Sequence, residues 1–363
     1  MKKICYVLSG IEYSGAEIVL ERILQGNKYI NSYFILLFKN VGIEKKLKKI
    51  YGDNKVYSLD IKYNKLLYSL TIPLLIWKVN KEIERYIYII QPDLIYVNNT
   101  REGMLCSKVA ERYSDKCIVH VHDMYESTNN PYAKLMIKRY LERYRKKITV
   151  SNATKESWNL KNMSVIYNGL DESYFEFNDK SGDIKNVAFV GSLTKRKGAD
   201  KFIDSIGDII KNLNLDIKIV YKYYDEQLKS NLSNLIEELK KNDSKTIQVL
   251  ENLSPNEIRK LYKEIDLLIV PSVRDPLPTV IMEAQANGVI VIGNNVDGIP
   301  EMIPNKELIT NLESSENIIN SIEKILAYNE EKIRELRRKV FEYSKQNFSI
   351  DKNRQKLERV LEE

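Results

Sequence analysis

The sequence contains few of the residues that build disulfide frameworks and metal centres. Its 363 residues include three cysteines and two histidines. The cysteines, Cys5, Cys106 and Cys117, are odd in number and show no metal-binding spacing. A disulfide-stapled fold is therefore excluded, and buried thiols in a reducing, cytoplasmic compartment are expected.

Long hydrophobic runs are also missing. The longest largely apolar stretch, Leu66 to Trp77, contains Pro73 and is far shorter than the roughly 20 residues that span a bilayer. The amino-terminal run, Ile4 to Leu8, is shorter than the apolar core of a signal peptide. The sequence thus predicts no membrane-spanning helix, and Ile4 to Leu8 is interpreted as a first β-strand.

The positive charge is concentrated in the first half of the chain. Residues 1–180 hold 29 Lys and Arg against 20 Asp and Glu, whereas the remainder holds 28 against 30. Such a basic half suits an anionic partner, either a membrane surface, a phosphorylated substrate or nucleic acid; the alternative is a solvated basic surface. Nucleic acid is not expected, because no recognised module or basic-aromatic stacking pattern is present.

Short β-rich runs alternate with helical segments in two series, which predicts two α/β domains with parallel sheets. The polar stretch 171–185 breaks the pattern and is interpreted as a linker. The predicted organisation is an amino-terminal domain at 1–170, a carboxyl-terminal domain at 186–330 and charged helices at 331–363, which are expected to pack back on the first domain. In doubly wound sheets ligands bind beyond the carboxyl ends of the strands.

Two candidate sites lie in the first domain. Ser14 and Glu17 fit a helix capping box, while Gly15 between them lets a ligand approach the backbone at the start of a helix. His120 and His122, the only histidines, share one side of a strand that is expected to end at His122. Structural hydrogen bonding is the simpler interpretation of this pair, but the strand end favours a functional His122; zinc is disfavoured for want of a third ligand.

Two candidate sites lie in the second domain. Val190 to Gly198 places glycines and basic residues between a strand and a helix, which suits a phosphate, although a basic surface turn is the alternative. Pro271 to Ala284 is a proline-rich loop before a helix that Thr279 is expected to cap, with acids at Asp275 and Glu283. The backbone amides at the start of this helix, near Thr279 and Val280, could hold a diphosphate, and the carboxylate of Glu283 could bind a ribose. The alternative is that Glu283 only complements the helix dipole.

Four segments, in order, resemble the retaining glycosyltransferases of family 4, which have the GT-B fold. The acid-x7-acid spacing of Asp275 and Glu283, followed by a glycine-containing turn, carries most of this resemblance. The matching segments are Ser14–Glu17, Ile166–Asp171, Phe189–Gly198 and Asp275–Ala284 with Gly298–Glu301. The resemblance implies two doubly wound, Rossmann-like α/β domains that face a central cleft, with helices at the carboxyl terminus.

The resemblance also implies roles for individual residues. Glu283 would bind the donor ribose, Asp275 would lie near hydroxyls of the donor sugar, and Lys197 would stabilise the departing diphosphate. His122 would lie close to the transferred sugar, so that His122, Lys197 and Asp275 form the catalytic set. Further donor-binding residues would be Gly15, Ser192, Arg196, Leu277, Pro278, Thr279 and Val280. Ser192 replaces the usual arginine, Leu277-Pro278 the usual Phe-Gly, and Asp275 the usual glutamate.

The expected reaction moves a sugar from a nucleotide-diphosphate sugar to an acceptor hydroxyl and needs no strong base of the enzyme's own.

 The departing phosphate oxygen would take the acceptor proton, and Lys and amides would stand in for a metal, so no metal and no cofactor are expected. The expected donor is a UDP-sugar. By family analogy the enzyme would be a hexosyltransferase of bacterial surface-glycan synthesis, making capsule, O-antigen or lipid-linked oligosaccharide.

One segment of the sequence bears on the chemistry of the acceptor. Residues 63–88 combine leucines and Trp77 with Lys65, Lys78, Lys81 and Arg85, which suits an amphipathic helix on an anionic membrane and a lipid-linked acceptor. A core helix with a polar back is the alternative. Other functions that remain open are a glycoside hydrolase or epimerase using Asp275 and Glu283, and a non-catalytic subunit that binds sugar nucleotides.

Overall fold

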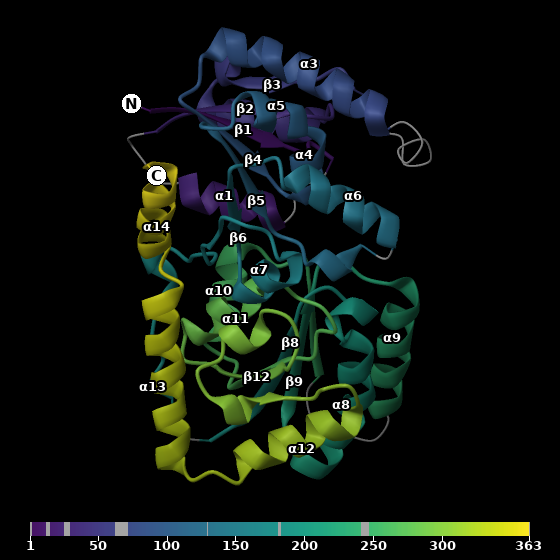
Figure 1. Cartoon of the computed structure of the whole chain (residues 1–363). Helices are drawn as coiled ribbons and strands as arrows, with labels where there is room; N and C mark the ends of the chain where they lie inside the picture. Colours follow the sequence, from purple (N-terminus) through teal and green to yellow (C-terminus); the bar gives the residue numbers. More distant parts are fainter. Residues whose placement is uncertain are drawn as a thin grey trace. The chain divides into compact units, whose positions relative to one another are not determined.

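The computed structural model describes residues 2–11, 15–24, 30–61, 72–128, 130–180, 183–240 and 247–362. The chain forms two compact units, each an α/β structure (Figure 1). Unit 1 comprises Met1–Gly169 with Asn353–Glu363, and unit 2 comprises Leu170–Lys352. Among the described residues, no helix combines the length and the apolar character needed to cross a membrane.

Unit 1 is built on a seven-stranded parallel sheet in the order β3-β2-β1-β4-β5-β6-β7. The central strands β4 and β5 are buried along their whole length, because helices cover both faces of such a sheet. The strands are β1 (Lys2–Leu8), β2 (Ile30–Leu36), β3 (Val56–Ser58), β4 (Leu94–Asn98), β5 (Cys117–Val121), β6 (Lys146–Thr149) and β7 (Met163–Val165).

The helices of unit 1 present apolar faces to this sheet. In the long helix α3, buried residues recur at helical spacing from Ile76 through Ile83 to Ile90, so one side of it is core. The opposite side exposes Leu74 and Trp77. The helices are α1 (Gly15–Leu24), α2 (Val41–Tyr51), α3 (Ile72–Ile90), α4 (Thr100–Leu105), α5 (Ser107–Arg112), α6 (Pro131–Leu141), α7 (Asn152–Trp158) and α14 (Ile350–Glu362).

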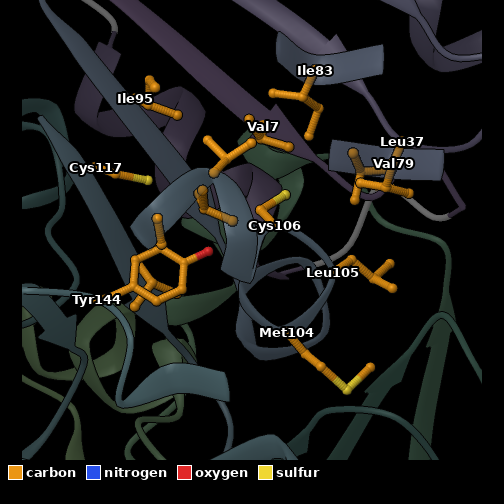
Figure 2. Packing of buried hydrophobic residues seen from close by; sticks show 14 of the residues in the cluster. Val7, Leu37, Val79, Ile83, Ile95, Met104, Leu105, Cys106, Cys117 and Tyr144 are labelled. Carbon is orange, nitrogen blue, oxygen red and sulfur yellow. The ribbon is translucent and has the colours of Figure 1, made fainter. Parts of the chain in front are cut away.

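The core of unit 1 holds the cysteines. Figure 2 shows Cys106 and Cys117 among side chains such as Val7 and Ile95, with the ring of Tyr144 beside them. All three cysteines are free and buried, which confirms the prediction of buried thiols. Burial raises the pKa of each thiol, that of Cys5 to about 12, so these groups stay protonated and act as small apolar side chains.

Unit 2 repeats the same winding with six parallel strands in the order β10-β9-β8-β11-β12-β13. Helix α8 contacts α9 and α12 along one face, and α11 contacts α10 and α13 along the other (Figure 1). The strands are β8 (Asn186–Val190), β9 (Asp216–Tyr221), β10 (Ile247–Glu251), β11 (Leu267–Val270), β12 (Ile290–Asn294) and β13 (Ile309–Thr310). The helices are α8 (Ala199–Leu213), α9 (Glu226–Lys240), α10 (Pro255–Tyr262), α11 (Thr279–Gln285), α12 (Ser315–Leu326) and α13 (Glu330–Asn347).

A buried carboxylate fastens the start of unit 2 and helix α13 to the sheet. Asp266 accepts hydrogen bonds from Arg337 Nη2 and Lys180 Nζ, both at 3.1 Å, and from the backbone amides of Lys185 and Asn186 at 3.0 Å. Arg337 is itself 1% exposed. Residues 171–180 and 183–185, in the stretch interpreted as a linker, thus belong to unit 2, and Ser181 and Gly182 lie outside the described residues.

The end of the chain returns to unit 1. Helix α14 contributes Arg354, whose Nε donates to the carbonyl oxygen of Ile23 at 3.0 Å, and Asn353, whose Nδ2 donates to the carbonyl oxygen of Asn168 at 3.1 Å. In both sheets the strand order reverses beside the first strand, between β1 and β4 and between β8 and β11. These reversals are the places where doubly wound sheets bind ligands.

Candidate active site

The loop after β8 and the loop after β11 are held against each other at the reversal in unit 2. Gly198, which precedes α8, has φ +69°, and a Cβ atom there would lie 2.0 Å from the carbonyl oxygen of Pro271. Only glycine permits this approach. The amide of Val273 donates to the carbonyl oxygen of Arg196 at 2.9 Å, and Arg196 Nη1 donates to that of Arg274 at 3.3 Å.

The contact between these loops joins two of the predicted catalytic residues. Lys197 Nζ donates to Asp275 Oδ2 in an ion pair. The side chain of Lys197 is 21% exposed and that of Asp275 is 7% exposed. A charged pair that is shielded from water in this way is stronger than a surface pair. The Lys197 side chain nevertheless remains partly exposed.

Asp297, in the turn after β12, fixes the other side of Asp275. Its Oδ2 accepts from the backbone amide of Asp275 at 2.9 Å, and its Oδ1 pairs with Arg274 Nη1 at 3.1 Å. The amide of Gly298 returns a hydrogen bond to the carbonyl oxygen of Asp275 at 3.2 Å. Burial raises the pKa of Asp297, and Arg274 opposes that shift.

Helix α11 carries the second acid. It begins at Thr279 with Pro278 at the cap position, so the prediction that Thr279 caps the helix is wrong by one residue. Proline has no side-chain acceptor, and no side chain caps this helix. The first amides of a helix have no partner within it, which leaves those at its start available. Leu277 and Pro278 are buried, and Thr279 and Val280 are half-buried.

Glu283 lies one turn into α11 and is 8% exposed. The hydroxyl group of Tyr262, at the end of α10, donates to Glu283 Oε2 at 3.4 Å. Sequence reasoning missed both Tyr262 and Asp297. Tyr262 carries no local signal, since only the packing of α10 on α11 brings it to Glu283. Asp297 could have been found from its position directly after a buried strand, in an Asp-Gly pair before the predicted turn.

The remaining donor-site candidates of unit 2 are Ser192 and Arg196. Ser192 is half-buried and its carbonyl oxygen accepts from the amide of Thr194 at 2.9 Å. The Arg196 guanidinium is exposed and contacts a neutral carbonyl group, whereas that of Arg274 is paired with Asp297. Among the described residues no three His, Cys, Asp or Glu side chains gather as metal ligands would.

Unit 1 holds the other two predicted residues. Gly15 is the first residue of α1, and Ser14 of the proposed capping box lies outside the described residues. Strand β5 ends at Val121, so His122 directly follows the strand rather than ending it. Its Nε2 lies 3.1 Å from Asn98 Oδ1 at the end of β4. Burial lowers the pKa of His122 to about 3, which keeps the imidazole neutral.

Both halves of the sequence match models of glycosyltransferase families. Residues 48–174 match the family "Glycosyltransferase Family 4", and residues 171–347 match "Glycosyl transferases group 1". Together the two matches run from residue 48 to residue 347.

Several curated proteins are similar in sequence. An Escherichia coli UDP-Gal:alpha-D-GlcNAc-diphosphoundecaprenol alpha-1,3-galactosyltransferase is 26% identical over 263 residues, which cover 64% of this chain and 66% of that protein. Two uncharacterized glycosyltransferases of Methanocaldococcus jannaschii are 29% and 32% identical over 43% and 40% of this chain. Those matches span 44% and 38% of the two archaeal proteins, so each of the three relatives is matched over less than two thirds of its length.

Solved structures match the whole chain. The Anabaena protein HepE in complex with UDP has a TM-score of 0.78 at 17% identity, with all of both chains covered. Sucrose-phosphate synthase from Thermosynechococcus elongatus has a TM-score of 0.77 at 16% identity, over 99% of this chain and 98% of that one. At these identities the likeness shows the fold, which is the GT-B arrangement of two doubly wound domains expected from the sequence.

Proposed function

Because the chain belongs to glycosyltransferase family 4 and has the GT-B fold, we propose that it transfers a sugar from a nucleoside-diphosphate sugar to an acceptor hydroxyl with retention of configuration. The observation that carries this proposal is the shielded pair of Lys197 and Asp275 beside the uncapped start of α11. This arrangement offers one cation and free amides to a diphosphate, and carboxylates to the hydroxyl groups on either side of it.

Each end of the donor has a proposed partner in unit 2. The carboxylate of Glu283, oriented by Tyr262, binds the ribose hydroxyls. The amides of Thr279 and Val280, with Lys197 and Arg196, bind the diphosphate. Asp275 binds hydroxyls of the sugar, while Ser192, Leu277 and Pro278 contact the donor through their backbone. From unit 1, Gly15 and His122 contact the donor, with His122 at the transferred sugar.

In the proposed reaction, the bond between the anomeric carbon and the diphosphate oxygen breaks as the nucleoside diphosphate leaves with the electron pair. The acceptor oxygen forms its bond to the anomeric carbon on the same face, and its proton passes to the departing phosphate oxygen. Lys197 stabilises the growing negative charge, and one such donor is typically worth about 3–4 kcal/mol. Lys197 must then share its ammonium between Asp275 and the phosphate.

The proposed donor is a UDP-sugar, with no metal and no cofactor. Two observations support this choice: HepE binds UDP and UDP-glucose with a fold of the same kind, and the Escherichia coli relative is named for UDP-Gal. The name of that relative also specifies a diphosphoundecaprenol-linked acceptor. We therefore propose a lipid-linked acceptor, in the synthesis of a surface glycan at the inner face of the cell membrane.

Helix α3 presents a surface that suits contact with the cell membrane. Its outward side carries Leu74 at 64% exposure and Trp77 at 52%, with Lys81 Nζ 5.2 Å from the Trp77 ring centroid. Such a mixture of apolar and cationic groups suits the interface of an anionic membrane. The inward side of α3 is core, so the two interpretations of this segment apply to different faces of the helix. Residues 63–71 of the segment lie outside the described residues.

The surface is tested with vesicles. A double variant Leu74→Ser, Trp77→Ser should bind vesicles that contain anionic lipid several-fold more weakly than the native chain, in a sedimentation assay. Exchanging Glu237, an exposed residue of α9, for Gln provides the control. Unchanged binding by the double variant would remove α3 from the proposal.

The donor site is tested with a panel of nucleoside diphosphates. We expect UDP to raise the unfolding temperature, since a ligand at about 100 times its Kd adds about 2.7 kcal/mol. Glu283→Gln should abolish the shift, and Glu237→Gln should keep it. No response to any nucleotide would contradict the proposed donor.

Turnover separates the transferase from the other candidates. The anomeric configuration of the product, measured by NMR, should equal that of the donor. An inverted product would contradict retention. Release of free sugar from a glycoside would indicate a hydrolase, and donor binding without turnover on any acceptor would indicate a binding subunit.

A further inference from the structure

The carboxyl edge of the sheet in unit 1 holds a row of polar rings and one amide. Tyr96 and Asn98 lie two residues apart on β4, and His120 and His122 lie two residues apart at the end of β5, so each pair points to one side. Asn98 is the ladder partner of His120. The two imidazole rings stack at 4.0 Å between centroids, with 39° between their planes.

The proton on His120 is set by Tyr96. The Tyr96 hydroxyl oxygen lies 2.5 Å from His120 Nδ1. Burial raises the pKa of Tyr96 far above its usual value, so the phenol keeps its proton and donates it. His120 Nδ1 is then the acceptor, and the proton of the neutral ring is on Nε2. That Nε2 is buried and has no hydrogen-bond partner among the described residues.

The proton on His122 is set by Asn98. Asn98 is fully buried, and its Oδ1 can only accept, so the Nε2 of His122 at 3.1 Å is the donor. A neutral imidazole carries one proton, which leaves a lone pair on Nδ1 of His122. No hydrogen bond within the described ranges engages this Nδ1. Burial keeps both rings neutral, because it lowers the pKa of His120 well below its usual value and that of His122 to about 3.

We infer that Asn98 is a positioning residue that fixes His122 as a hydrogen-bond acceptor, so that His122 selects a sugar bearing a hydroxyl group over one bearing a carboxylate. A hydroxyl can donate to Nδ1, whereas a carboxylate presents only lone pairs to it. The inference rests on the proposed function, in which His122 contacts the transferred sugar. The arrangement of the protons belongs to unit 1 alone and does not depend on that role.

The protons can be observed directly, since the chain contains only two histidines. In a tag-free, nitrogen-15-labelled full chain, long-range proton–nitrogen NMR should show both rings with a protonated Nε2 and a bare Nδ1. Neither ring should titrate between pH 5 and 8. A protonated Nδ1 on His122, or a His122 pKa within this range, would overturn the inference.

Two variants test the role of Asn98. Asn98→Asp places a carboxylate against Nε2 and should raise the pKa of His122 by at least about one unit. Asn98→Ala removes the acceptor and should let His122 exchange between both tautomers, which the same spectrum detects. Asn40→Asp is the matched control, because Asn40 caps α2, where Asp serves equally well. An unchanged His122 spectrum in both Asn98 variants would leave Asn98 without the positioning role.

Competition between two donors tests whether the site selects a hydroxyl-bearing sugar over one that bears a carboxylate. With UDP-glucose and UDP-glucuronate, which differ by a hydroxymethyl group against a carboxylate, kcat/KM should favour the hydroxyl-bearing donor by about tenfold or more. Asn98→Ala should narrow this ratio, because a His122 ring that exchanges between both tautomers can carry its proton on Nδ1 and donate it to a carboxylate. Equal use of both donors by the native chain would overturn the selection. Absence of turnover with every donor would instead contradict the proposed function, while the spectrum would still decide the proton arrangement.

Discussion

The two sheets wind in the same order but differ in the chemistry at their carboxyl edges. The edge in unit 2 is charged, with Lys197 paired to Asp275 and Arg274 to Asp297. The edge in unit 1 carries a row of neutral side chains, Tyr96, Asn98, His120 and His122, which forms its uncharged edge, and His122 in this row hydrogen-bonds to Asn98. Because the topology is shared, it does not determine what either edge binds. The charged edge suits a diphosphate, and the uncharged edge suits neutral hydroxyl groups.

The largest predicted effect comes from removing Lys197, the cation at the charged edge of unit 2. Lys197→Ala is expected to lower kcat by about 10²–10³, because it removes the donor that stabilises the leaving diphosphate and leaves Asp275 buried without its ion pair. Steady-state kinetics with a UDP-sugar measure the effect. Lys211→Ala, at the exposed far end of helix α8, is the control and should retain native rates. A loss of less than about tenfold would mean that Lys197 is not the main charge on the diphosphate.

The next effect concerns the backbone that assembles the charged edge. Gly198→Ala forces a Cβ atom against the carbonyl oxygen of Pro271 and should destabilise the chain by about 1–3 kcal/mol. Gly207 lies within helix α8, which Gly198 precedes, and a Cβ atom at Gly207 would meet nothing within 4 Å, so Gly207→Ala should stabilise the chain by about 0.5–1 kcal/mol. Urea unfolding of the two variants compares them. Equal effects of the two substitutions would show that the loops are not held together at Gly198.

The uncharged edge predicts a dependence of stability on pH. Unfolded imidazole titrates near 6.5, whereas His122 in the folded chain titrates near 3, so the unfolded chain binds more protons between these values. The free energy of unfolding should therefore fall as the pH drops from about 6.5 toward 3, by up to about 1.4 kcal/mol per pH unit for each buried histidine.

Urea unfolding at pH 7 and pH 5 measures this slope. Glu102 has the opposite effect on the free energy of unfolding. Burial raises the pKa of its carboxyl to about 7, so over this pH range the folded chain binds a proton that the unfolded chain does not. His122→Gln isolates the histidine contribution and should flatten the fall relative to the native chain. A slope that is identical with and without the imidazole would mean that His122 is charged when folded.

The smallest predicted effect concerns Asp297, which holds Asp275 and Arg274 at the charged edge of unit 2. Asp297→Asn keeps an acceptor for the amide of Asp275 but loses the charge opposite Arg274, whose side chain is 44% exposed. Exposed pairs are worth about 0.2–1 kcal/mol, so kcat/KM should fall by only about two- to fivefold. Asp297→Ala also loses the hydrogen bond and should cost more. If both variants behave alike, the hydrogen bond to the Asp275 amide contributes nothing to the site.

Local patterns were sufficient for most of the fold. Buried parallel strands are near-continuous apolar runs, so the first strand was predicted at Ile4 to Leu8, and it is observed at Lys2–Leu8. Helix α10 likewise begins with a local pattern, a capping box of Ser254 and Glu257 with Pro255 at the first helical position. The two-residue strand β13 was not predicted, because so short a segment has no periodicity.

The candidate site was less accessible to sequence reasoning. The spacing of Asp275 and Glu283 pointed to one loop and one helix, yet the contacts that orient these two residues come from distant positions. Asp297 reaches Asp275 across 22 positions, and Tyr262 reaches Glu283 across 21. Asn98 reaches His122 across 24. Such partners are neighbours only because parallel strands and their helices end at one edge of the sheet, and no local sequence pattern predicts these contacts.

The carboxylate of Asp266 sets the limits within which unit 2 can be separated from the rest of the chain. A fragment covering residues 186–330 would omit Lys180, the amide of Lys185 and Arg337, and would leave a buried anion with only part of its hydrogen-bond donors. A fragment covering residues 170–352 keeps all of them and is the natural choice for expressing this unit alone or joining it to a different amino-terminal unit.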